Sequence, residues 1–199
     1  FIDSMTHMVI NPTWHVPASI AGKEYLPIIR NDPGFLKRKN MAMLNSAGKS
    51  VNPANIDLAA YSEDNFPYFI KQRPNAGNAL GKVKFMFPNK FNIYLHDTPS
   101  KSLFSREVRA FSHGCIRVHQ PFDFAYKLLE RQSSNPKGLF HGFLKTGQEK
   151  YVNLKAPVQV IIAYQTVIFD AKGKASYRGD IYGRDAKIAA ALKKAGVAI

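Results

Sequence analysis

Cysteine is almost absent from this chain, which has one thiol in 199 residues. A single cysteine cannot form an intramolecular disulfide, so a disulfide-stabilised scaffold is excluded. Long apolar runs are also missing, because no stretch approaches the roughly 18–20 apolar residues that a membrane-spanning helix needs. Acidic residues are few: 14 Asp and Glu stand against 28 Lys and Arg. The sequence therefore predicts a basic protein that folds without disulfides and without a transmembrane segment.

The excess of basic residues gives a formal net charge of +14 and a sequence pI near 9.9. Of the 28 basic residues, 17 follow residue 99, so the charge is concentrated in the second half. Such a chain favours polyanions, anionic surfaces or acidic substrates as partners. We expect no nucleic-acid partner, because the sequence has neither an aromatic–basic binding motif nor a nucleic-acid fold signature.

Size and composition indicate one folded domain that spans residues 1–199. The mass is 22.3 kDa, with 45% hydrophobic and 21% charged residues, which is ordinary for a folded chain. The first residue is Phe1, and neither a charged nor an apolar export-signal region follows it. We therefore expect a processed or trimmed fragment, with any export signal outside this chain.

The pattern of apolar residues predicts an α+β fold in which strands are in the majority. A helix is expected after Ser19 as N-cap, with a kink or early end at Pro27. A second helix of about ten residues begins at Pro121, and a third is capped by Asp185 and ends at Gly196. Strands are expected at residues 7–10, 82–87 and 91–95, and as buried apolar runs at 158–163 and 166–169.

Residues 31–79 differ from the rest of the chain. Proline and glycine punctuate this segment, as at Pro33-Gly34 and Asn52-Pro53, and its hydrophobic periodicity is weak. We interpret it as an irregular lid inserted into the domain, without a hydrophobic core of its own.

The chemistry is concentrated in residues 94–99 and 112–119. A lone cysteine is usually a small buried hydrophobe, but Cys115 follows the small polar turn Ser112-His113-Gly114. Converging backbone N–H groups and the nearby Arg117 favour the thiolate, which is the nucleophilic form. The glycine allows close approach of a substrate carbonyl and a backbone oxyanion hole. We therefore predict a nucleophilic cysteine.

Three histidines lie near enough in sequence to act as its base. Spacing alone ranks His96 first, because it ends a predicted strand whose return connection could bring it beside Cys115. His113 suits the oxyanion turn better, and His119 lies one turn away only if the segment is helical. A metal site from these residues is not expected, since zinc sites normally use three or four ligands in recognisable pairs and no second cysteine exists.

Several segments resemble the YkuD-type L,D-transpeptidases, and in particular their large periplasmic branch. The signature is Ser-His-Gly-Cys-Ile-Arg at residues 112–117, preceded by a histidine at a strand end. Segments far from the signature match as well, so the resemblance covers nearly the whole chain. They are Asn-Pro-Thr-Trp-His-Val-Pro-Ala-Ser-Ile (residues 11–20), Leu-His-Asp-Thr-Pro-Ser (95–100), Leu103-Phe104 and Asp-Ile-Tyr-Gly-Arg-Asp (180–185).

The resemblance implies a YkuD-like mixed β fold with flanking helices, in which residues 31–79 form an insertion that caps the catalytic groove. This chain lacks the strands that normally precede the Asn-Pro-x-Trp segment in the family. By resemblance, Cys115 is the nucleophile and His96 the general base. The other matching roles are the carbonyl of Asp97 that orients His96, the oxyanion turn of Ser112, His113 and Gly114, and substrate binding by Tyr94, Arg106, Arg109 and Arg117.

The same resemblance implies the reaction. A peptidoglycan stem tetrapeptide acylates the cysteine and releases D-alanine, and an amine of a second stem then forms a 3→3 cross-link. Water or a protein amine as acceptor are the rival readings, and nothing in the sequence separates them. The resemblance also implies acylation by carbapenem-type β-lactams, a location in the periplasm or cell envelope of a Gram-negative bacterium, and neither a cofactor nor a metal. Arg117 stands where many family members have asparagine.

Overall fold

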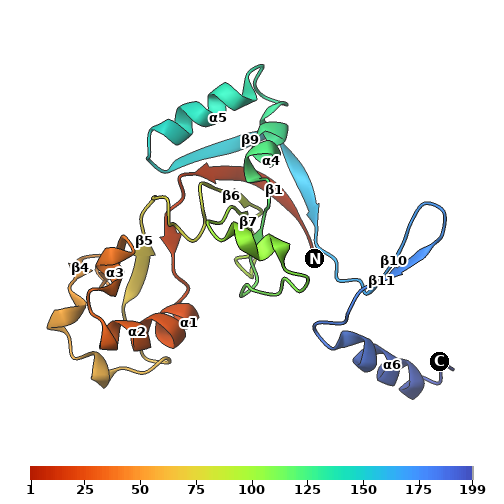
Figure 1. Cartoon of the computed structure of the whole chain (residues 1–199), viewed down its shortest axis with the longest axis horizontal. Coiled ribbons are helices and arrows are strands. Elements are labelled where there is room, and N and C mark those ends of the chain that lie inside the picture. The colour runs from red at the N-terminus through yellow and green to blue at the C-terminus, as the bar shows by residue number, and fades with distance from the viewer. Residues whose placement is uncertain (199) are drawn as a thin grey trace.

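The computed structural model describes residues 1–198, which fold around a five-stranded sheet (Figure 1). The α+β class is confirmed, with 30% helix and 24% strand, so helical residues outnumber strand residues and strands are not in the majority. The strand order is β8-β7-β6-β1-β9. These strands are β1 (Ile2–Ile10), β6 (Val83–Met86), β7 (Leu95–His96), β8 (Ile116–Arg117) and β9 (Lys150–Ile161).

The interior strand β1 is longer than the four residues expected, and it pairs antiparallel with β6 and β9. Its residues Met5, Met8 and Ile10 are buried and pack with Phe85 of β6 in the main hydrophobic core. Two helices cover this core: α4 (Pro121–Leu129) and α5 (Pro136–Lys145).

Proline begins both helices, at a position where a helix leaves a backbone N–H unpaired in any case. The α4 helix is the one that the sequence predicts from Pro121. The α5 helix was not expected, although its Asn135 side chain accepts a hydrogen bond from Gly138 N at 2.9 Å and so forms a recognisable N-cap.

The expected early helix is present, with differences at its start and middle. It runs through α1 (Ala18–Ile20), a π-helical turn η1 (Ala21–Tyr25) and α2 (Leu26–Asn31). The N-cap residue is Pro17 and not Ser19. The π turn immediately precedes the α2 segment that contains Pro27, whose ring nitrogen cannot donate a helical hydrogen bond. The proline therefore does not end the helix, which continues to Asn31.

Residues 14–72, which we call the accessory lobe, have a hydrophobic core of their own. A four-stranded sheet of order β2-β5-β3-β4 packs on the early helix, and Ile29, Leu36, Met43 and Ile70 are buried between them. The expectation that residues 31–79 are irregular and lack a core is therefore wrong. The lobe contains β2 (Trp14–His15), α3 (Phe35–Arg38), β3 (Met41–Leu44), β4 (Ser50–Val51), η2 (Pro53–Asn55), η3 (Leu58–Ala60) and β5 (Phe69–Gln72).

Three strand predictions need correction. In residues 91–95 only Leu95 is in a strand, because β7 comprises two residues. Residues 158–161 form the end of β9, where exposed and half-buried side chains alternate. The strand β10 (Val167–Phe169) pairs with β11 (Ala175–Tyr177) in a hairpin whose β10 side chains are exposed. Apolar composition alone therefore overestimated burial in the second half of the chain.

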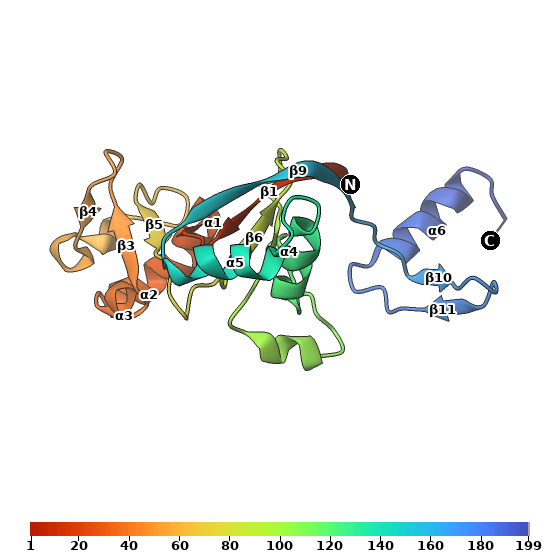
Figure 2. The same ribbon diagram turned by 90° about the horizontal axis from the view of Figure 1, so that it is seen from above.

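The C-terminal hairpin and the helix α6 (Arg184–Lys194) form a unit that extends away from the main sheet, on the side opposite the accessory lobe (Figure 2). Helix α6 starts after Gly183, which has a φ of 61°, so Asp185 lies in the first turn and is not the cap. It ends before Gly196, as expected. We call residues 163–198 the C-terminal module. None of the described helices is long and apolar enough to cross a membrane.

The core of the accessory lobe yields a stability prediction. Met43→Ala removes a side chain that is 1% exposed, and we expect it to lower the free energy of unfolding by about 2–4 kcal/mol. The fluorescence of Trp14, the one tryptophan of the chain, reports this loss in urea because its ring packs against the same core. Phe69→Ala, at a 59% exposed position of the same sheet, is the control. Equal effects of both substitutions would contradict a packed lobe.

Candidate active site

Two short strands bring the predicted catalytic residues to one face of the sheet. Strands β7 and β8 run parallel, with Leu95 opposite Ile116 and His96 opposite Arg117. Ile116 N donates to Tyr94 O at 3.0 Å, and Val118 N donates to His96 O at 2.8 Å. Because side chains alternate along a strand, Tyr94, His96, Cys115 and Arg117 all belong to the same face. The structure therefore brings together four of the residues that the sequence singled out.

His96 is buried, with 5% of its surface exposed, and its Nδ1 hydrogen-bonds to the carbonyl oxygen of Asp97. A carbonyl oxygen only accepts, so Nδ1 carries the proton and Nε2 keeps a free lone pair. Burial lowers the pKa of His96 to about 4; the hydrogen bond to Asp97 opposes this shift and the charge of Arg117 adds to it. At neutral pH His96 is thus an uncharged imidazole that can accept a proton.

The carboxylate of Asp97 holds the loop that orients His96. Its Oδ2 accepts from Lys82 N at 2.8 Å, and its Oδ1 accepts from Thr98 N at 2.7 Å and from Lys101 Nζ at 2.6 Å. Gly81, with a φ of 61°, lies so close that a Cβ there would overlap the carboxyl group. Asp97 therefore contributes more than the backbone carbonyl for which the resemblance singled it out.

Cys115 is partly buried, and its Sγ lies 3.8 Å from the carbonyl oxygen of Asn92. Burial raises the pKa of the Cys115 thiol, while hydrogen bonds with Tyr94 and the charge of Lys84 pull it back only in part. The expected thiolate, stabilised by neighbouring N–H groups and Arg117, is therefore not the resting form. The site therefore rests with a neutral thiol and a neutral imidazole, and the thiol's hydrogen-bond partners are the Asn92 carbonyl oxygen and Tyr94 and not His96.

The turn before the cysteine is held by its own serine. Ser112 Oγ donates to the Cys115 carbonyl oxygen and accepts from Gly114 N at 3.0 Å. Gly114 has a φ of 141°, a conformation that favours glycine. The His113 ring points to the accessory lobe, where its Nε2 lies 3.1 Å from Glu24 Oε1. The Gly114 N–H, expected in the oxyanion hole, is thus engaged by Ser112 in this arrangement.

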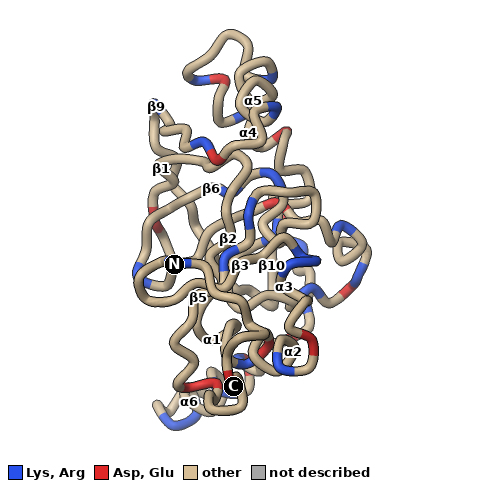
Figure 3. The backbone as a smooth tube through the Cα atoms, turned by 90° about the vertical axis from the view of Figure 1, so that its left-hand side faces the viewer, with Lys and Arg blue, Asp and Glu red and all other residues tan. Residues whose placement is uncertain are grey.

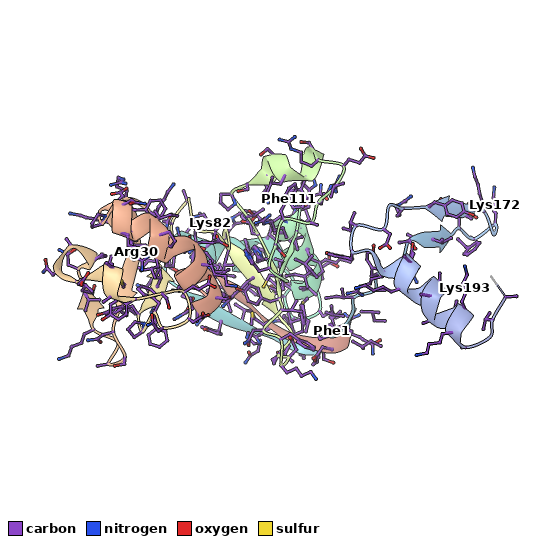
Figure 4. The ribbon with its side chains drawn as sticks, turned by 90° about the horizontal axis from the view of Figure 1, so that it is seen from below. Phe1, Arg30, Lys82, Phe111, Lys172 and Lys193 are labelled. Atoms are coloured by element: carbon purple, nitrogen blue, oxygen red, sulfur yellow. The ribbon has the colours of Figure 1, made fainter. Side chains whose placement is uncertain are left out.

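A cavity of about 350 Å³ opens beside Cys115. Figure 4 labels Phe111 on the loop that follows η4 (Lys101–Ser105), and this side chain contributes to the lining. Arg109 and Arg117 also line the cavity, whereas Arg106 does not. The carbonyl oxygen of Arg106 accepts a hydrogen bond from Arg109 Nε at 2.8 Å. The remaining lining residues are Leu103, Phe104, Ala110, Ser112, Gly114, Cys115, Ile116 and Tyr182.

Arg117 carries a buried donor with no acceptor, because its Nε finds no hydrogen-bond partner within residues 1–198. An unsatisfied buried donor costs about 1–3 kcal/mol, and more when the group is charged. An anionic or carbonyl oxygen entering the cavity could satisfy it. Basic residues occupy several elements around the molecule, in keeping with its net charge (Figure 3).

The structure also locates His119, the third histidine near Cys115 in sequence, and allows a search for a metal-binding cluster. His119 is exposed, and its ring centroid lies 4.9 Å from that of Phe104. Within residues 1–198, no cluster of three or more His, Cys, Asp or Glu side chains is arranged to hold a metal ion.

Sequence reasoning missed four residues of this site: Gly81, Lys84, Asn92 and Tyr182. Lys84 is opposite His96 in the sheet and its Nζ lies 5.5 Å from the Tyr94 ring centroid. The position of Lys84 opposite His96 depends on the register between β6 and β7, which the sequence does not reveal. Gly81 carried a weak signal, as a glycine directly before a predicted strand, and Tyr182 belongs to a segment noted only for its resemblance.

The fold and this site define a cysteine-containing domain of one known family. The model of the L,D-transpeptidase catalytic domain, YkuD, matches residues 1–160, and the chain belongs to this family. A Haemophilus influenzae protein provisionally named an L,D-transpeptidase is 31% identical over 191 residues. That similarity covers 92% of this chain and 37% of the relative, so this chain spans well under half of the relative's length.

The contact between Gly81 and Asp97 can be tested by substitution. Gly81→Ala adds a methyl group that overlaps the Asp97 carboxylate, and we expect a loss of about 3 kcal/mol or more in the free energy of unfolding. Gly147→Ala is the matched control, because its φ of 66° is similarly strained for alanine but its Cβ meets open space. The control should cost about 1–2 kcal/mol. Equal losses in urea denaturation would show that Asp97 is not held at Gly81.

The resting protonation state predicts how alkylation of Cys115 depends on pH. Because the thiol pKa is raised, the thiolate fraction and the iodoacetamide rate should climb about tenfold per pH unit from about pH 6 to about pH 8. Intact-protein mass reports the reaction at one site, since the chain has one thiol. A rate that is already constant near pH 6 would indicate a preformed thiolate–imidazolium pair and contradict the neutral resting state.

Proposed function

We propose that this chain is the catalytic part of a peptidoglycan L,D-transpeptidase that uses Cys115 as nucleophile and His96 as general base. The observation that carries the proposal is the pairing of β7 with β8, which sets a buried, neutral histidine on the same face of the sheet as the one thiol, and this thiol lines a cavity. Family membership supplies the reaction class, and the described geometry supplies the candidate groups.

In the proposed first step, the Cys115 sulfur attacks the carbonyl that precedes the terminal D-alanine of a stem tetrapeptide. His96 Nε2 takes the thiol proton as the S–C bond forms, and then gives it to the departing amine of D-alanine. A thioester remains on the enzyme. The amine of a second stem attacks this thioester, regenerates the thiol and forms the 3→3 cross-link. Backbone N–H groups of the turn at His113, Gly114 and Cys115 stabilise the oxyanion in both steps.

The electrostatics of the resting site support a role for the substrate's own charge. The His96 pKa is near 4 and the thiol pKa is raised, so proton transfer between them is unfavourable before substrate binds. A substrate carboxylate at Arg117 offsets the positive charge that helps to lower the His96 pKa, and it satisfies the unpaired Nε. Binding of an anionic donor therefore makes His96 a stronger base at the moment it is needed.

The arginines and Tyr94 form the proposed donor site. Arg109 and Arg117 line the cavity, and we assign the stem carboxylates to them. Arg106 belongs to the approach to the cavity, because its side chain is exposed and outside the lining. Tyr94 directly precedes β7 beside Cys115, as the bond from Ile116 N to Tyr94 O at 3.0 Å indicates, and we propose that it contacts the donor near the scissile bond.

The accessory lobe is proposed to cap the groove and favour an amine over water as acceptor. The contact between Glu24 and His113 supports this role, because it connects the lobe to the catalytic turn. Hydrolysis of the thioester by water, and attachment of a protein amine to peptidoglycan, are alternative outcomes at the same site. Carbapenems are proposed to acylate Cys115, and the cell envelope, in the Gram-negative periplasm, is the proposed location.

One assay tests the proposal. Incubation with a purified stem tetrapeptide should release D-alanine, and mass spectrometry of the muropeptides should separate 3→3 dimers from hydrolysed tripeptide. Cys115→Ala should abolish release, because the chain has no other thiol. His96→Ala should slow it by about two to four orders of magnitude, the usual range for a general base.

His119→Ala is the matched control, because this histidine is exposed and packs on Phe104. Its rate should stay within about threefold of wild type. Release of D-alanine by the Cys115→Ala variant would sink the nucleophile assignment. A larger effect at His119 than at His96 would identify the wrong base.

A further inference from the structure

One wall of the cavity comes from outside the segment that matches the family model. The match ends at residue 160, yet Tyr182 of the C-terminal module lines the cavity together with Phe104, Phe111 and Cys115. Figure 1 shows the loop before α6 extending back towards the catalytic part of the chain. This contact is unexpected for a module that otherwise extends away from the sheet.

Hydrogen bonds fix the backbone of Tyr182 within the module. The Tyr164 hydroxyl donates to Asp180 Oδ1 at 2.6 Å and accepts from Tyr182 N at 3.4 Å. The other carboxylate oxygen, Asp180 Oδ2, accepts from Asp185 N at 2.7 Å. The two ends of the loop that carries Tyr182 are therefore joined through one carboxylate. The Asp180 pKa is lowered to about 2, chiefly by the Tyr164 hydrogen bond, so this carboxylate stays charged.

A tilted aromatic contact and a nearby guanidinium hold the ring of Tyr182. The Tyr164 and Tyr182 ring centroids are 5.0 Å apart, and the Arg184 guanidinium lies 5.3 Å from the first and 5.6 Å from the second. Helix α6 has no buried residue. The cluster of Tyr164, Asp180, Tyr182 and Arg184 thus holds an aromatic ring at the cavity.

We propose that Tyr182 is a substrate-binding residue whose ring completes the donor site, so that the C-terminal module is part of the active site. The inference rests on the proposed function. The cavity combines the aromatic rings of Phe104, Phe111 and Tyr182 with the guanidinium groups of Arg109 and Arg117. Such a lining matches an extended peptide that presents carboxylates and short aliphatic side chains.

The proposal predicts which kinetic constant changes. The Tyr182 ring lines the cavity but supplies no acid, base or nucleophile, so it binds the donor equally in the ground and transition states. Loss of such a contact raises KM and leaves kcat unchanged. We expect Tyr182→Ala to raise KM for the tetrapeptide about tenfold, with kcat within about twofold of wild type. Tyr182→Phe should stay near wild type, because the ring forms the wall.

Two further variants separate binding from folding. Tyr177→Ala is the matched control, since Tyr177 lies in the same module, is 76% exposed and does not line the cavity; it should change neither constant. Arg184→Ala frees the ring without removing it and should raise KM about threefold. Circular dichroism and the iodoacetamide rate of Cys115 should be the same in all variants. A Tyr182→Ala variant that is folded and has an unchanged KM overturns the proposal.

Binding measured without turnover distinguishes this inference from the proposed function. In a Cys115→Ala background, isothermal titration with the same tetrapeptide should give a Kd about tenfold weaker when Tyr182 is also alanine. If wild type releases no D-alanine but this difference in Kd is present, the transpeptidase assignment fails and the binding role of Tyr182 stands. If the peptide binds equally to both proteins, or to neither, the role of Tyr182 is refuted.

Discussion

The parallel pairing of β7 with β8 is the constraint on which the site depends. It is the single parallel pair among the described strands, and each strand has two residues. Parallel strands start at the same end of a sheet, so Tyr94 and Cys115, which directly precede β7 and β8, lie side by side. A pair this short makes few ladder hydrogen bonds. The buried Asp97, which binds two backbone N–H groups and the Lys101 ammonium, supplies the stabilisation that the short ladder lacks.

Burial and charge explain why a basic protein holds a neutral thiol and a neutral imidazole on the same face of the sheet. Burial lowers the pKa of His96 to about 4, and the positive charge of Arg117 on the neighbouring strand adds to that shift. Burial also raises the pKa of the Cys115 thiol more than the hydrogen bonds with Tyr94 and the charge of Lys84 lower it. The Nε of Arg117, which is buried and has no acceptor among residues 1–198, can pair with an anion that enters the cavity. Composition alone predicts acidic partners for this basic chain, and at the site that excess of basic residues includes an arginine without an acceptor.

Local patterns predicted the parts of the fold that depend on neighbours in sequence, such as β6, α4 and the residues around Cys115. The accessory lobe was misjudged because its core joins Ile29, Leu36, Met43 and Ile70 across many prolines and glycines, through strands of two to four residues. The exposed β10 was called buried because burial depends on a covering partner, which composition does not reveal. The protonation of Cys115 was misjudged for the same reason: desolvation is a property of the folded environment.

The accessory lobe and the C-terminal module reach the catalytic turn from opposite sides, and both contacts are weak compared with the support beneath His96. His113 and Glu24 are at least half exposed, and an ion pair of that kind contributes about 0–1 kcal/mol. Tyr182 is 55% exposed and held mainly within its own module. In contrast, the Asp97 side chain is 8% exposed and fully engaged. The residues that support His96 are thus held rigidly, whereas the contacts of the accessory lobe and of the C-terminal module with the site can break at small cost. The proposed reaction, which admits a donor, releases an amine and then admits an acceptor, would require this combination, because the reacting groups must stay in place while the entrance opens twice.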